Sequence, residues 1–399
     1  MNDQVSEMAD SALSAEWVVD GPGLLRLREP WNALAQQVES PSVFLRHEWF
    51  SAAWQWRKHD SQLRLLCVYR GYDLLGICPL IECRDRKYGI TLRVLEFLTV
   101  PDTQYCDILV RGADRRAVID LIIATLDRDR GNWDQLRLSY LEKHSPVIIE
   151  MQAALNSCRF PTQLSEGHVN PFINLEGGWK PFYGNRSRRL KKANNYVANR
   201  IQRAIQAAEI LWVSSSSAEL DVDRWLSAAV DISRRSWKRQ TGKSLDQSGP
   251  GDFIRSLTSE ARRNGWLSIW LLLFDGKPVA MEYQLLYHGY VHALRADYDE
   301  DVHDLSPGSY LNWKLLEQLF EGGYQRYWMG PGENRYKFHW TDHRETLFDL
   351  TTYSGTLRGR LFGVLNLRLK PILRRWFKGA DPKAADVPPQ GTQAFLENR

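Results

Sequence analysis

Short apolar runs separated by turn sequences dominate the second half of the chain. Leu267–Phe274 and Val279–Tyr287 are apolar runs on either side of the turn sequence Asp275-Gly276-Lys277-Pro278. His288-Gly289 marks a second turn, and Tyr290–Ala296 is a third run. Runs of this length between Gly and Pro residues are typical of strands joined by hairpins. The pattern therefore predicts a β-meander.

A helix and a further strand are predicted after the meander. A polar loop over residues 297–305 leads to Ser306-Pro307-Gly308. Serine suits the N-cap position and proline the first helical position, so a helix is expected from here to about Glu321. Gly322-Gly323 ends this helix, and Tyr324–Met329 is the next strand-like run.

The first half repeats this order of elements. The repetition lies in element order and predicts two similar α/β units of about 150 residues each, a usual domain size. Ser145–Leu164 is expected to supply the last helix and strand of the first unit. The other predicted elements are strands at Leu63–Tyr69, Leu74–Glu82, Leu92–Leu98, Cys106–Val110 and Trp133–Tyr140, a helix at Ala113–Arg130, and helices near Pro30–Gln37, Glu48–Arg57 and Val222–Gln240.

The chain is thus expected to divide into five segments. Residues 1–14 are predicted to be disordered, 15–165 to form the first domain, and 166–355 to form the second domain with the active site. Residues 356–379 are predicted to form a basic amphipathic helix, and 380–399 a disordered tail.

Composition narrows the classes of protein. Apolar residues make up 43% and charged residues 25% of the 399, as in an ordinary globular protein, and the net charge of +4 does not indicate a DNA-binding protein. The five cysteines form no CxxC pair, which favours a reduced, cytoplasmic chain. The acidic N-terminus does not resemble a signal peptide, and no apolar run reaches the length of roughly 18 residues that spans a membrane.

No metal site is predicted. The pairs His288/His292 and His339/His343 have HxxxH spacing, but positions four apart on extended chain lie roughly 13 Å from each other. The HExxH motif is absent from the sequence.

Two stretches are strongly basic, each with seven Lys or Arg residues and no acid: residues 186–203 and 357–379. In the first, Arg188, Arg189 and Lys192 are candidates to hold the phosphates of CoA, a nucleotide-sugar or tRNA; the alternative is a solvated helix face. The second has apolar residues at helical spacing, and Pro371 is expected to kink it. It is a candidate for peripheral contact with an anionic membrane, or for a helix packed on the first domain.

Candidate catalytic residues gather around the stretch RYWMGPGENRYKFHWT, residues 326–341. Lys337 lies between aromatic residues just past a strand end, where it can supply positive charge to an oxyanion or a phosphate. Glu282 and Gln284 share one side of the strand Val279–Tyr287. A general base can come from Glu282 or from the loop Tyr298-Asp299-Glu300-Asp301. Ser306 and Gly308 open a helix whose free amides favour an anion.

The order of meander, helix and strand resembles the core of the GNAT acyltransferase fold. SVFLRHEWFSAAW, LLGICPLIE, PFINL followed by a basic helix, SWKRQTGKSL, and the stretch from AMEYQLLYHGY through SPGSYLNW to ENRYKFHW look like the CelD/BcsL family of GNAT-like proteins. The resemblance covers about residues 41–350. That family is similar in architecture to the FemABX aminoacyl transferases, which pair two GNAT-like domains and in which the chain end returns to the first domain.

The resemblance implies an α/β fold of two tandem GNAT-like domains, with mixed, mostly antiparallel sheets flanked by helices. It implies N-acyl transfer, and its members are linked with exopolysaccharide or lipid modification. The leading hypothesis is transfer from acyl-CoA, without a metal, to an amine on a sugar or lipid-linked acceptor in exopolysaccharide or envelope biosynthesis. In FemABX enzymes the lysine matching Lys337 is assigned a charge-stabilising role. From the residue patterns together with the resemblance, the candidate catalytic residues are Lys337, Asp299, Glu282 and Tyr298. The candidate donor-binding residues are Ser306, Gly308, Arg188, Arg189 and Lys192, and the candidate substrate-binding residues are Tyr336, Trp340, Gln284 and Trp237.

One departure keeps alternatives open. Ordinary GNAT enzymes have Arg/Gln-x-x-Gly-x-Gly/Ala before the pyrophosphate-binding helix, whereas this chain has DVHDLSPGSY. An aminoacyl-tRNA-dependent transferase of the FemABX type is therefore a second hypothesis. A non-catalytic GNAT-like subunit that binds polysaccharide is a third.

Overall fold

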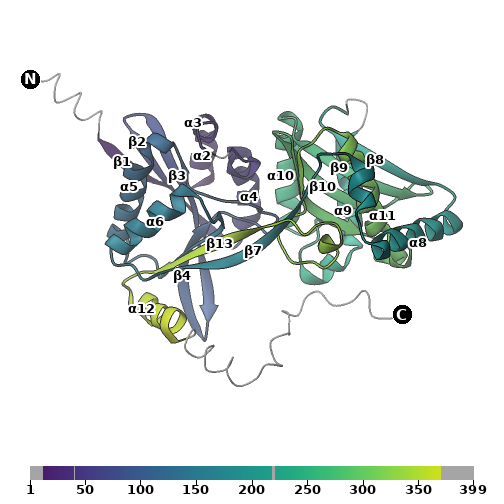
Figure 1. The fold of residues 1–399 in the computed structure, drawn as a ribbon. Helices are drawn as coiled ribbons and strands as arrows, with labels where there is room; N and C mark the ends of the chain where they lie inside the picture. Colours follow the sequence, from purple (N-terminus) through teal and green to yellow (C-terminus); the bar gives the residue numbers. More distant parts are fainter. Residues whose placement is uncertain (1–11, 40, 218–220, 370–399) are drawn as a thin grey trace, which may run out of the picture.

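A single twisted sheet runs through the whole molecule, and helices flank it in two lobes (Figure 1). The computed structural model describes residues 12–39, 41–217 and 221–369. The sheet has thirteen strands in the order β1-β2-β3-β4-β6-β13-β7-β12-β11-β10-β9-β8, with β5 paired to β3.

The first lobe is built from residues up to about 160. Its strands are β1 (Leu13–Val18), β2 (Ser61–Arg70), β3 (Asp73–Lys87), β4 (Ile90–Phe97), β5 (Leu109–Val110) and β6 (Gln135–Glu142). Its helices are α2 (Gly21–Arg26), α3 (Arg28–Ala35), α4 (His47–Arg57), α5 (Arg115–Arg128) and α6 (Pro146–Ser157), with short 3₁₀ turns η1 (Val43–Leu45) and η2 (Gly112–Asp114).

The second lobe follows the long strand β7 (Thr162–Asn174). Its strands are β8 (Ala208–Ser214), β9 (Leu267–Phe274), β10 (Lys277–Tyr287), β11 (Tyr290–Tyr298) and β12 (Arg326–Trp328). Its helical elements are α7 (Trp179–Gly184), α8 (Arg188–Ala204), α9 (Val222–Arg234), η3 (Trp237–Thr241), α10 (Pro250–Arg263), η4 (Glu300–Leu305), α11 (Pro307–Glu321) and η5 (Lys337–His339).

The expected duplication is present in the pairing of the strands. Each lobe has an antiparallel meander, β2-β3-β4 or β9-β10-β11, followed by a helix, α5 or α11. The next strand then pairs parallel to the last strand of the meander, β6 with β4 and β12 with β11. Both parallel ladders are three residues long, so in each lobe the two strands part soon after they meet.

Two long strands join the lobes. β7 pairs with β13 (Arg344–Tyr353) from Thr162 to Pro171, and its last three residues pair with β12. β13 in turn pairs with β6, so the chain returns to the first lobe after completing the second. The sheet therefore continues across residue 165, where the sequence placed a domain boundary.

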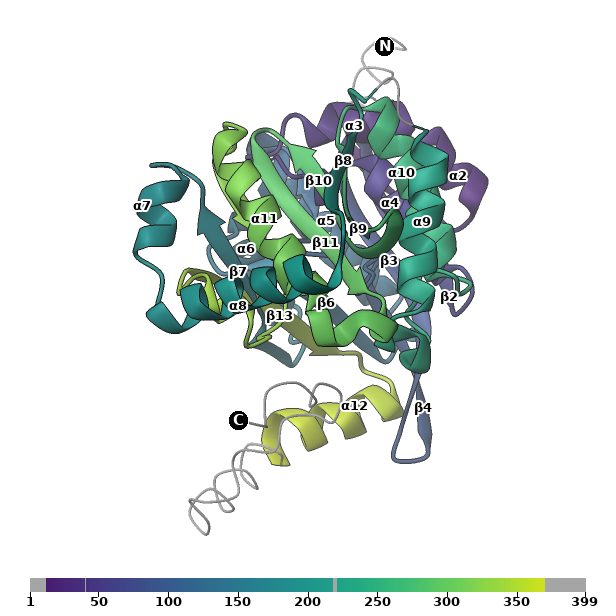
Figure 2. The ribbon, with the colours of Figure 1, turned by 90° about the vertical axis from the view of Figure 1, so that its right-hand side faces the viewer.

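Both faces of the sheet carry an apolar core. The larger cluster fills the first lobe and continues under α9 and α10, where Trp49 of α4 meets Phe253 of α10 with ring centroids 5.4 Å apart. The second cluster lies between the opposite face of the second lobe and α7, α8 and α11. Figure 2 shows α8 crossing the outer side of α11.

Several elements differ from the expectations. β1 begins at Leu13, inside the segment predicted to be disordered, because its residues pair with β2. The helix expected to reach Gln240 ends at Arg234, and a 3₁₀ turn follows. The pattern of the sequence did not separate β8, α10 and β13 as elements. The disorder predicted for residues 1–11 and 380–399 lies outside the described residues.

The tail segment is helical and packs on the first lobe. It forms α12 (Leu357–Gly363), which continues as the π-helical turn η6 (Val364–Leu369). Phe362 is buried against Leu92, Val94 and Tyr353. Leu361 and Val364, which belong to the predicted apolar stripe, are exposed, so α12 buries Phe362 and leaves these two side chains in solvent. The expected kink at Pro371 lies outside the described residues.

Candidate active site

The strands β11 and β12 separate and leave an opening in the second lobe. β12 pairs with β11 only over Tyr290–His292, while β11 continues to Tyr298. Gly330, at φ +80°, brings the chain so close to β11 that a Cβ there would lie 3.1 Å from the Ala293 carbonyl oxygen. Ala296 is exposed although its neighbours along β11 are buried, which marks the opening.

Glu282 lies at this opening. It pairs directly opposite Ala296, so the two side chains project to the same face of the sheet. That face carries α11. The Glu282 carboxylate is 3% exposed, and its Oε1 accepts hydrogen bonds from the Tyr327 hydroxyl at 2.6 Å and the Gln284 amide at 2.8 Å. The Asn312 side chain of α11 also bonds to Glu282.

The protonation of Glu282 is set by opposing effects. Burial raises the pKa of this carboxyl above its ordinary value, and the hydrogen bonds and the charge of Lys337 reduce the rise. Burial likewise raises the pKa of the Tyr327 phenol, so Tyr327 stays a donor. A carboxylate with a raised pKa, oriented by three donors, has the properties of a general base near neutral pH.

A second layer of hydrogen bonds orients Gln284. Its Oε1 accepts from the Ser268 hydroxyl and the Trp270 indole, each at 3.0 Å, which directs its amide nitrogen to Glu282. Ser268 in turn accepts from the indole of Trp212 at 3.0 Å. Gln284 is fully buried, so the structure gives it a positioning role toward Glu282 in place of the expected substrate contact.

Lys337 is buried beside this network, 4% exposed. Its Nζ donates to the carbonyl oxygens of Gly330 at 2.7 Å and Pro331 at 3.2 Å, so the lysine also fixes the turn at the opening. Burial lowers its pKa to about 8, partly offset by Glu282 and reinforced by the charge of Lys238. Two of the three ammonium hydrogens are directed at carbonyls, and the third is left for a substrate.

The other predicted residues are distributed around this centre. Tyr336 is 47% exposed as a whole residue. Burial of its phenol and the charge of Glu282 raise the pKa of the hydroxyl above its ordinary value. Trp237 is 38% exposed at the start of η3, next to Lys238. Trp340 is 4% exposed and packs in the second core with Trp179, so it lies in the core and not on a pocket wall.

Asp299 has a structural environment. Its carboxylate is fully buried and pairs with Arg235 at 2.8 Å and Lys277 at 3.2 Å. Burial opposes its ionisation, but the Asp301 amide and the two cations outweigh this and hold its pKa below the ordinary value. Such a carboxylate is a poor base, and the geometry favours Glu282 for that role. Tyr298 lies half-buried beside Gly308.

The start of α11 differs from the expected cap. Pro307 occupies the first turn as predicted, but Ser306 has φ +52° and its hydroxyl makes no capping bond. Gly308 faces Tyr298, and a Cβ there would lie 3.2 Å from the Tyr298 ring. The helix start therefore keeps amides that an anion can bind.

The basic end of α8 lies close to the Lys337 segment. Arg186 donates to the Trp340 carbonyl oxygen, and burial together with the charges of Arg335 and Arg189 lowers the pKa of His339. Arg188, Arg189 and Lys192 are exposed, and within the described residues none of them pairs with an acid. This face is suited to a ligand with several phosphates.

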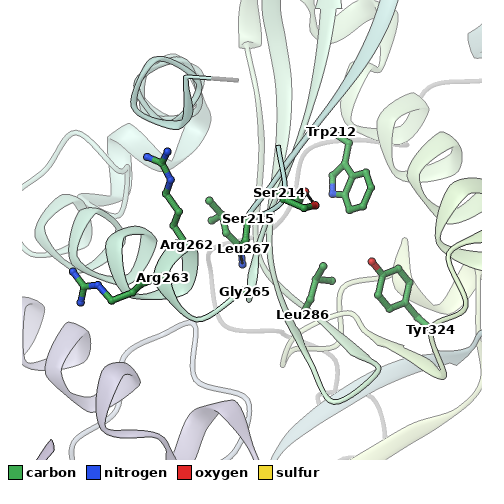
Figure 3. A pocket seen from close by; sticks show the side chains of 10 residues that line it. Trp212, Ser214, Ser215, Arg262, Arg263, Gly265, Leu267, Leu286 and Tyr324 are labelled. Atoms are coloured by element: carbon green, nitrogen blue, oxygen red, sulfur yellow. Dashed lines mark hydrogen bonds between the residues drawn. The ribbon is translucent and has the colours of Figure 1, made fainter. Parts of the chain in front are cut away.

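A hollow with a volume of about 410 Å³ lies elsewhere, at the end of β8 and β9. Figure 3 shows Arg262 and Arg263 on one side of these strands and Trp212, Leu286 and Tyr324 on the other. Its link to Glu282 is the hydrogen bond from Trp212 to Ser268. We assign the chemistry to Glu282 and Lys337, because the perturbed acid and base lie there and not in this hollow.

Sequence reasoning missed Tyr327, Asn312 and Lys238. Tyr327 falls in a run that looks like a plain apolar strand, and only the fold shows where its hydroxyl points. Asn312 is a polar residue at a buried position of a helix, 8% exposed, and this irregularity was the available signal. Lys238 bonds to the Ala296 carbonyl oxygen and Asp297, a contact made by the folding of η3 onto β11.

Among the residues that the structure describes, no group of three or more His, Cys, Asp or Glu side chains is arranged to hold a metal ion. In the same ranges, no helix combines the length and the apolar character needed to cross a membrane.

Comparisons with known proteins agree with this architecture. The family described as "Acetyltransferase (GNAT) domain" matches residues 191–338, so the chain carries a GNAT-like acyltransferase domain. A comparison with curated proteins finds no match.

Solved structures share the fold over most of the chain. The C-terminal domain of a putative lysylphosphatidylglycerol synthetase from Agrobacterium fabrum has a TM-score of 0.52 at 13% identity, covering 86% of this chain and 97% of that one. FemX has a TM-score of 0.52 at 9% identity, covering 81% and 95%. L-PGS from Bacillus licheniformis has a TM-score of 0.51 at 12% identity, covering 85% and 96%.

Proposed function

We propose that this protein is an N-acyltransferase that moves an acyl group from acyl-CoA to an amine on a sugar or lipid-linked acceptor, in exopolysaccharide or envelope biosynthesis of the CelD/BcsL type. The observation that carries the proposal is the buried Glu282 carboxylate beside Lys337 at the opening between β11 and β12. A GNAT-like domain covers these residues.

The residues divide the chemical tasks. The acceptor nitrogen attacks the thioester carbon of the donor. The new C–N bond replaces the C–S bond, and CoA leaves as a thiolate that is protonated to the free thiol. Glu282 takes the proton that the nitrogen loses, while Tyr327, Gln284 and Asn312 hold its carboxylate in place. Lys337 stabilises the negative charge that develops on the acyl oxygen. Its burial strengthens this effect, because little water screens the charge.

The anionic part of the donor is assigned to the basic surface. The start of α11 offers the amide of Gly308, and the end of α8 offers Arg188, Arg189 and Lys192. The end of α8 lies next to the Lys337 segment and contacts η4, and η4 leads into the start of α11. Phosphates held there leave the acyl end free to reach the opening.

The test is thermal stabilisation of the purified chain by acetyl-CoA, longer acyl-CoA thioesters and CoA alone. A ligand at one hundred times its Kd stabilises a protein by about 2.7 kcal/mol, a clear upward shift in Tm. Arg188→Gln/Arg189→Gln/Lys192→Gln is expected to remove most of the shift, and Arg263→Gln, a distant exposed control, none. Absence of any shift with every thioester contradicts acyl-CoA as the donor.

An aminoacyl-tRNA-dependent transferase is the second candidate. The exposed, unpaired cations of α8 and the missing glycine pattern before α11 favour it. Gel-shift titration with charged tRNA separates the two donors, since binding to tRNA falls steeply with salt. A non-catalytic subunit is recognised by ligand binding without turnover.

We also propose a peripheral contact with an anionic membrane through α12. Leu357, Leu361 and Val364 lie 87%, 46% and 46% exposed on this helix. Tyr88, 78% exposed at the tip of the β3–β4 hairpin, stacks on Phe362. Figure 2 shows α12 and the hairpin tip projecting together from the lower end of the molecule. Arg358 and Arg360 add positive charge at the same place.

A further inference from the structure

The sheet has a polar, half-open face on the side opposite Glu282. Tyr327 points to Glu282, so its neighbours Arg326 and Trp328 on β12 project to the other side. Phe172 of β7 pairs directly with Trp328, and their ring centroids are 4.9 Å apart. Figure 1 shows β7 and β13 crossing the waist between the two lobes, where this face lies.

Two carboxylates on this face lack a cation. Glu345 of β13 and Glu142 of β6 are half-buried, and the structure shows no hydrogen bond or ion pair to either side chain within its described ranges. Burial is the main cause, and the nearby charge of Glu345 the second, that raises the pKa of Glu142 to about 7. The two carboxylates therefore lie close to each other. Arg326, the cation nearest Glu345, is instead stacked on the rings of Phe172 at 4.3 Å and Trp328 at 5.1 Å.

A buried amide oxygen without a hydrogen-bond partner lies on the same face of the sheet as these two carboxylates. Asn170 of β7 pairs directly opposite Glu345, so both side chains project to one face. Asn170 is only 4% exposed, yet its Oδ1 has no hydrogen-bond partner. A buried amide oxygen without a hydrogen-bond partner destabilises the fold, and a bound donor group would supply that partner.

This group lies directly beside the proposed acyl-transfer site. The amide of Met329 donates to the Pro171 carbonyl oxygen, and that of Gly332 donates to Val169, on either side of Asn170. The turn between them includes Gly330, whose carbonyl oxygen accepts from Lys337. Neighbouring strands lie about 4.8 Å apart, so Asn170 is one strand from the backbone held by Lys337.

We propose that Glu142, Glu345 and Asn170 form the binding site for the acceptor and that the acceptor is a positively charged amine. The two substrates are then separated by charge. The anionic donor binds among the cations of α8 and the amides of α11, and the cationic acceptor binds on the opposite face of the sheet. The opening between β11 and β12 connects the two sides. The inference rests on the proposed acyl transfer for its role, but the cation site itself can be tested separately.

The test is calorimetric titration with hexane-1,6-diamine, with 1,6-hexanediol as a neutral probe of the same length. The wild-type chain is expected to bind the diamine and not the diol. Glu142→Gln/Glu345→Gln preserves shape and is expected to weaken diamine binding at least about tenfold, because each lost charge removes an attraction of the order of 1 kcal/mol. Glu209→Gln/Glu321→Gln removes two exposed, distant carboxylates and controls for net charge.

A gain-of-function variant guards against a folding artefact. Asn170→Asp adds a third negative charge at the unsatisfied amide and is expected to tighten diamine binding. Equal affinity for diamine in the wild type and the Glu142→Gln/Glu345→Gln variant overturns the proposal, as does diol binding as strong as that of the diamine. Diamine binding without any stabilisation by acyl-CoA supports the cation site while rejecting the proposed donor, so the two failures are distinguishable.

Discussion

At the scale of single residues, the buried charge of Lys337 lowers the free energy of unfolding. Its pKa of about 8 in the folded chain is below the ordinary value of 10.5. The folded protein therefore releases this proton earlier than the unfolded chain as pH rises. The destabilisation from the buried charge is complete below about pH 8 and disappears as pH rises toward 10.5. A charge retained at such a cost is typical of a functional site.

The first prediction follows from that charge. Lys337→Met is expected to lower turnover by about 10²–10³, the usual loss for one oxyanion donor. The cost of burying the charge is removed, while two hydrogen bonds to the Gly330 turn are lost, so we expect little net change in stability at pH 7. In the wild type, turnover is expected to fall as pH rises through about 8, where Lys337 loses its proton.

Lys337→Arg is the matched control for charge. It keeps a cation whose proton is not lost in this range, so the alkaline fall in turnover is expected to move to higher pH or vanish. If Lys337→Met turns over at the wild-type rate, the lysine only holds the turn at Gly330 and Pro331.

The second prediction concerns Glu282. Glu282→Gln keeps the shape and the hydrogen bond from Tyr327 but cannot accept a proton, so turnover is expected to fall about 10²–10⁴-fold. The Tm is expected to hold or rise, because a buried carboxylate has been neutralised. Asp299→Asn serves for comparison. Asp299→Asn loses the ion pairs with Arg235 and Lys277, so its Tm is expected to fall. If Asp299→Asn loses more turnover than Glu282→Gln, Asp299 and not Glu282 is the general base.

Sequence reasoning located part of this site, and the limits are physical. Strand alternation was sufficient to place Glu282 and Gln284 side by side, because the period of a strand is two. It could not place the Tyr327 hydroxyl or Asn312 there, since both arrive through the packing of α11 and β12. Trp340 was expected at a pocket wall because it lies near Lys337 in sequence. The 3₁₀ turn η5 rotates it into the core.

At the scale of elements, the start of α11 is the clearest local device. The preceding turn η4 ends in Ser306 at positive φ, which redirects the chain into the helix beside Tyr298. Glycine at 308 keeps the distance to the Tyr298 ring tolerable.

The third prediction tests this device. Gly308→Val places a branched side chain where a Cβ alone would be 3.2 Å from the Tyr298 ring, so it is expected to obstruct an anion at the helix start. We expect donor affinity, measured by calorimetry with the thioester that stabilises the wild type, to fall at least about tenfold. Glu321→Ala at the other end of α11 is the control. Wild-type affinity in Gly308→Val would place the phosphates elsewhere, with α8 as the remaining candidate.

Element order was the most predictable part of the fold. Apolar runs and the Gly or Pro turns between them were sufficient to predict both meanders and the helices α5 and α11, because these signals are local in the sequence. The sequence did not separate β13, whose pairing with β6 and β7 depends on segments about 200 and 180 residues away. The helix expected to reach Gln240 stopped at Arg234, because Arg235 turns inward to bind Asp299.

At the scale of the whole molecule, both lobes share one sheet but carry different side chains at equivalent places. The opening between β11 and β12 has Glu282 and Lys337. In the first lobe, β4 is the counterpart of β11, and its Glu96, beside β6, is paired with Arg57 at 2.8 Å and with Arg137. A carboxylate fixed by two arginines is not free to act as a base. The first lobe therefore contributes β6, β13 and the Asp102–Gln104 loop to the second lobe's site, where Gln104 donates to the Ala293 carbonyl oxygen at 2.7 Å.

The last prediction concerns the surface formed by α12 and the hairpin tip at Tyr88. Apolar side chains beside arginines suit an interfacial contact, and each cation near an anionic bilayer adds about 1 kcal/mol. The full chain is expected to co-sediment with vesicles containing anionic lipid and much less with neutral vesicles. Leu357→Ser/Leu361→Ser/Val364→Ser is expected to reduce the bound fraction at least about threefold while leaving Phe362 to anchor the helix. Tyr72→Ser, just before the opposite end of β3 and fully exposed, is the control. Equal recovery of wild type and triple variant, or no preference for anionic lipid, would rule out a membrane contact through these three side chains.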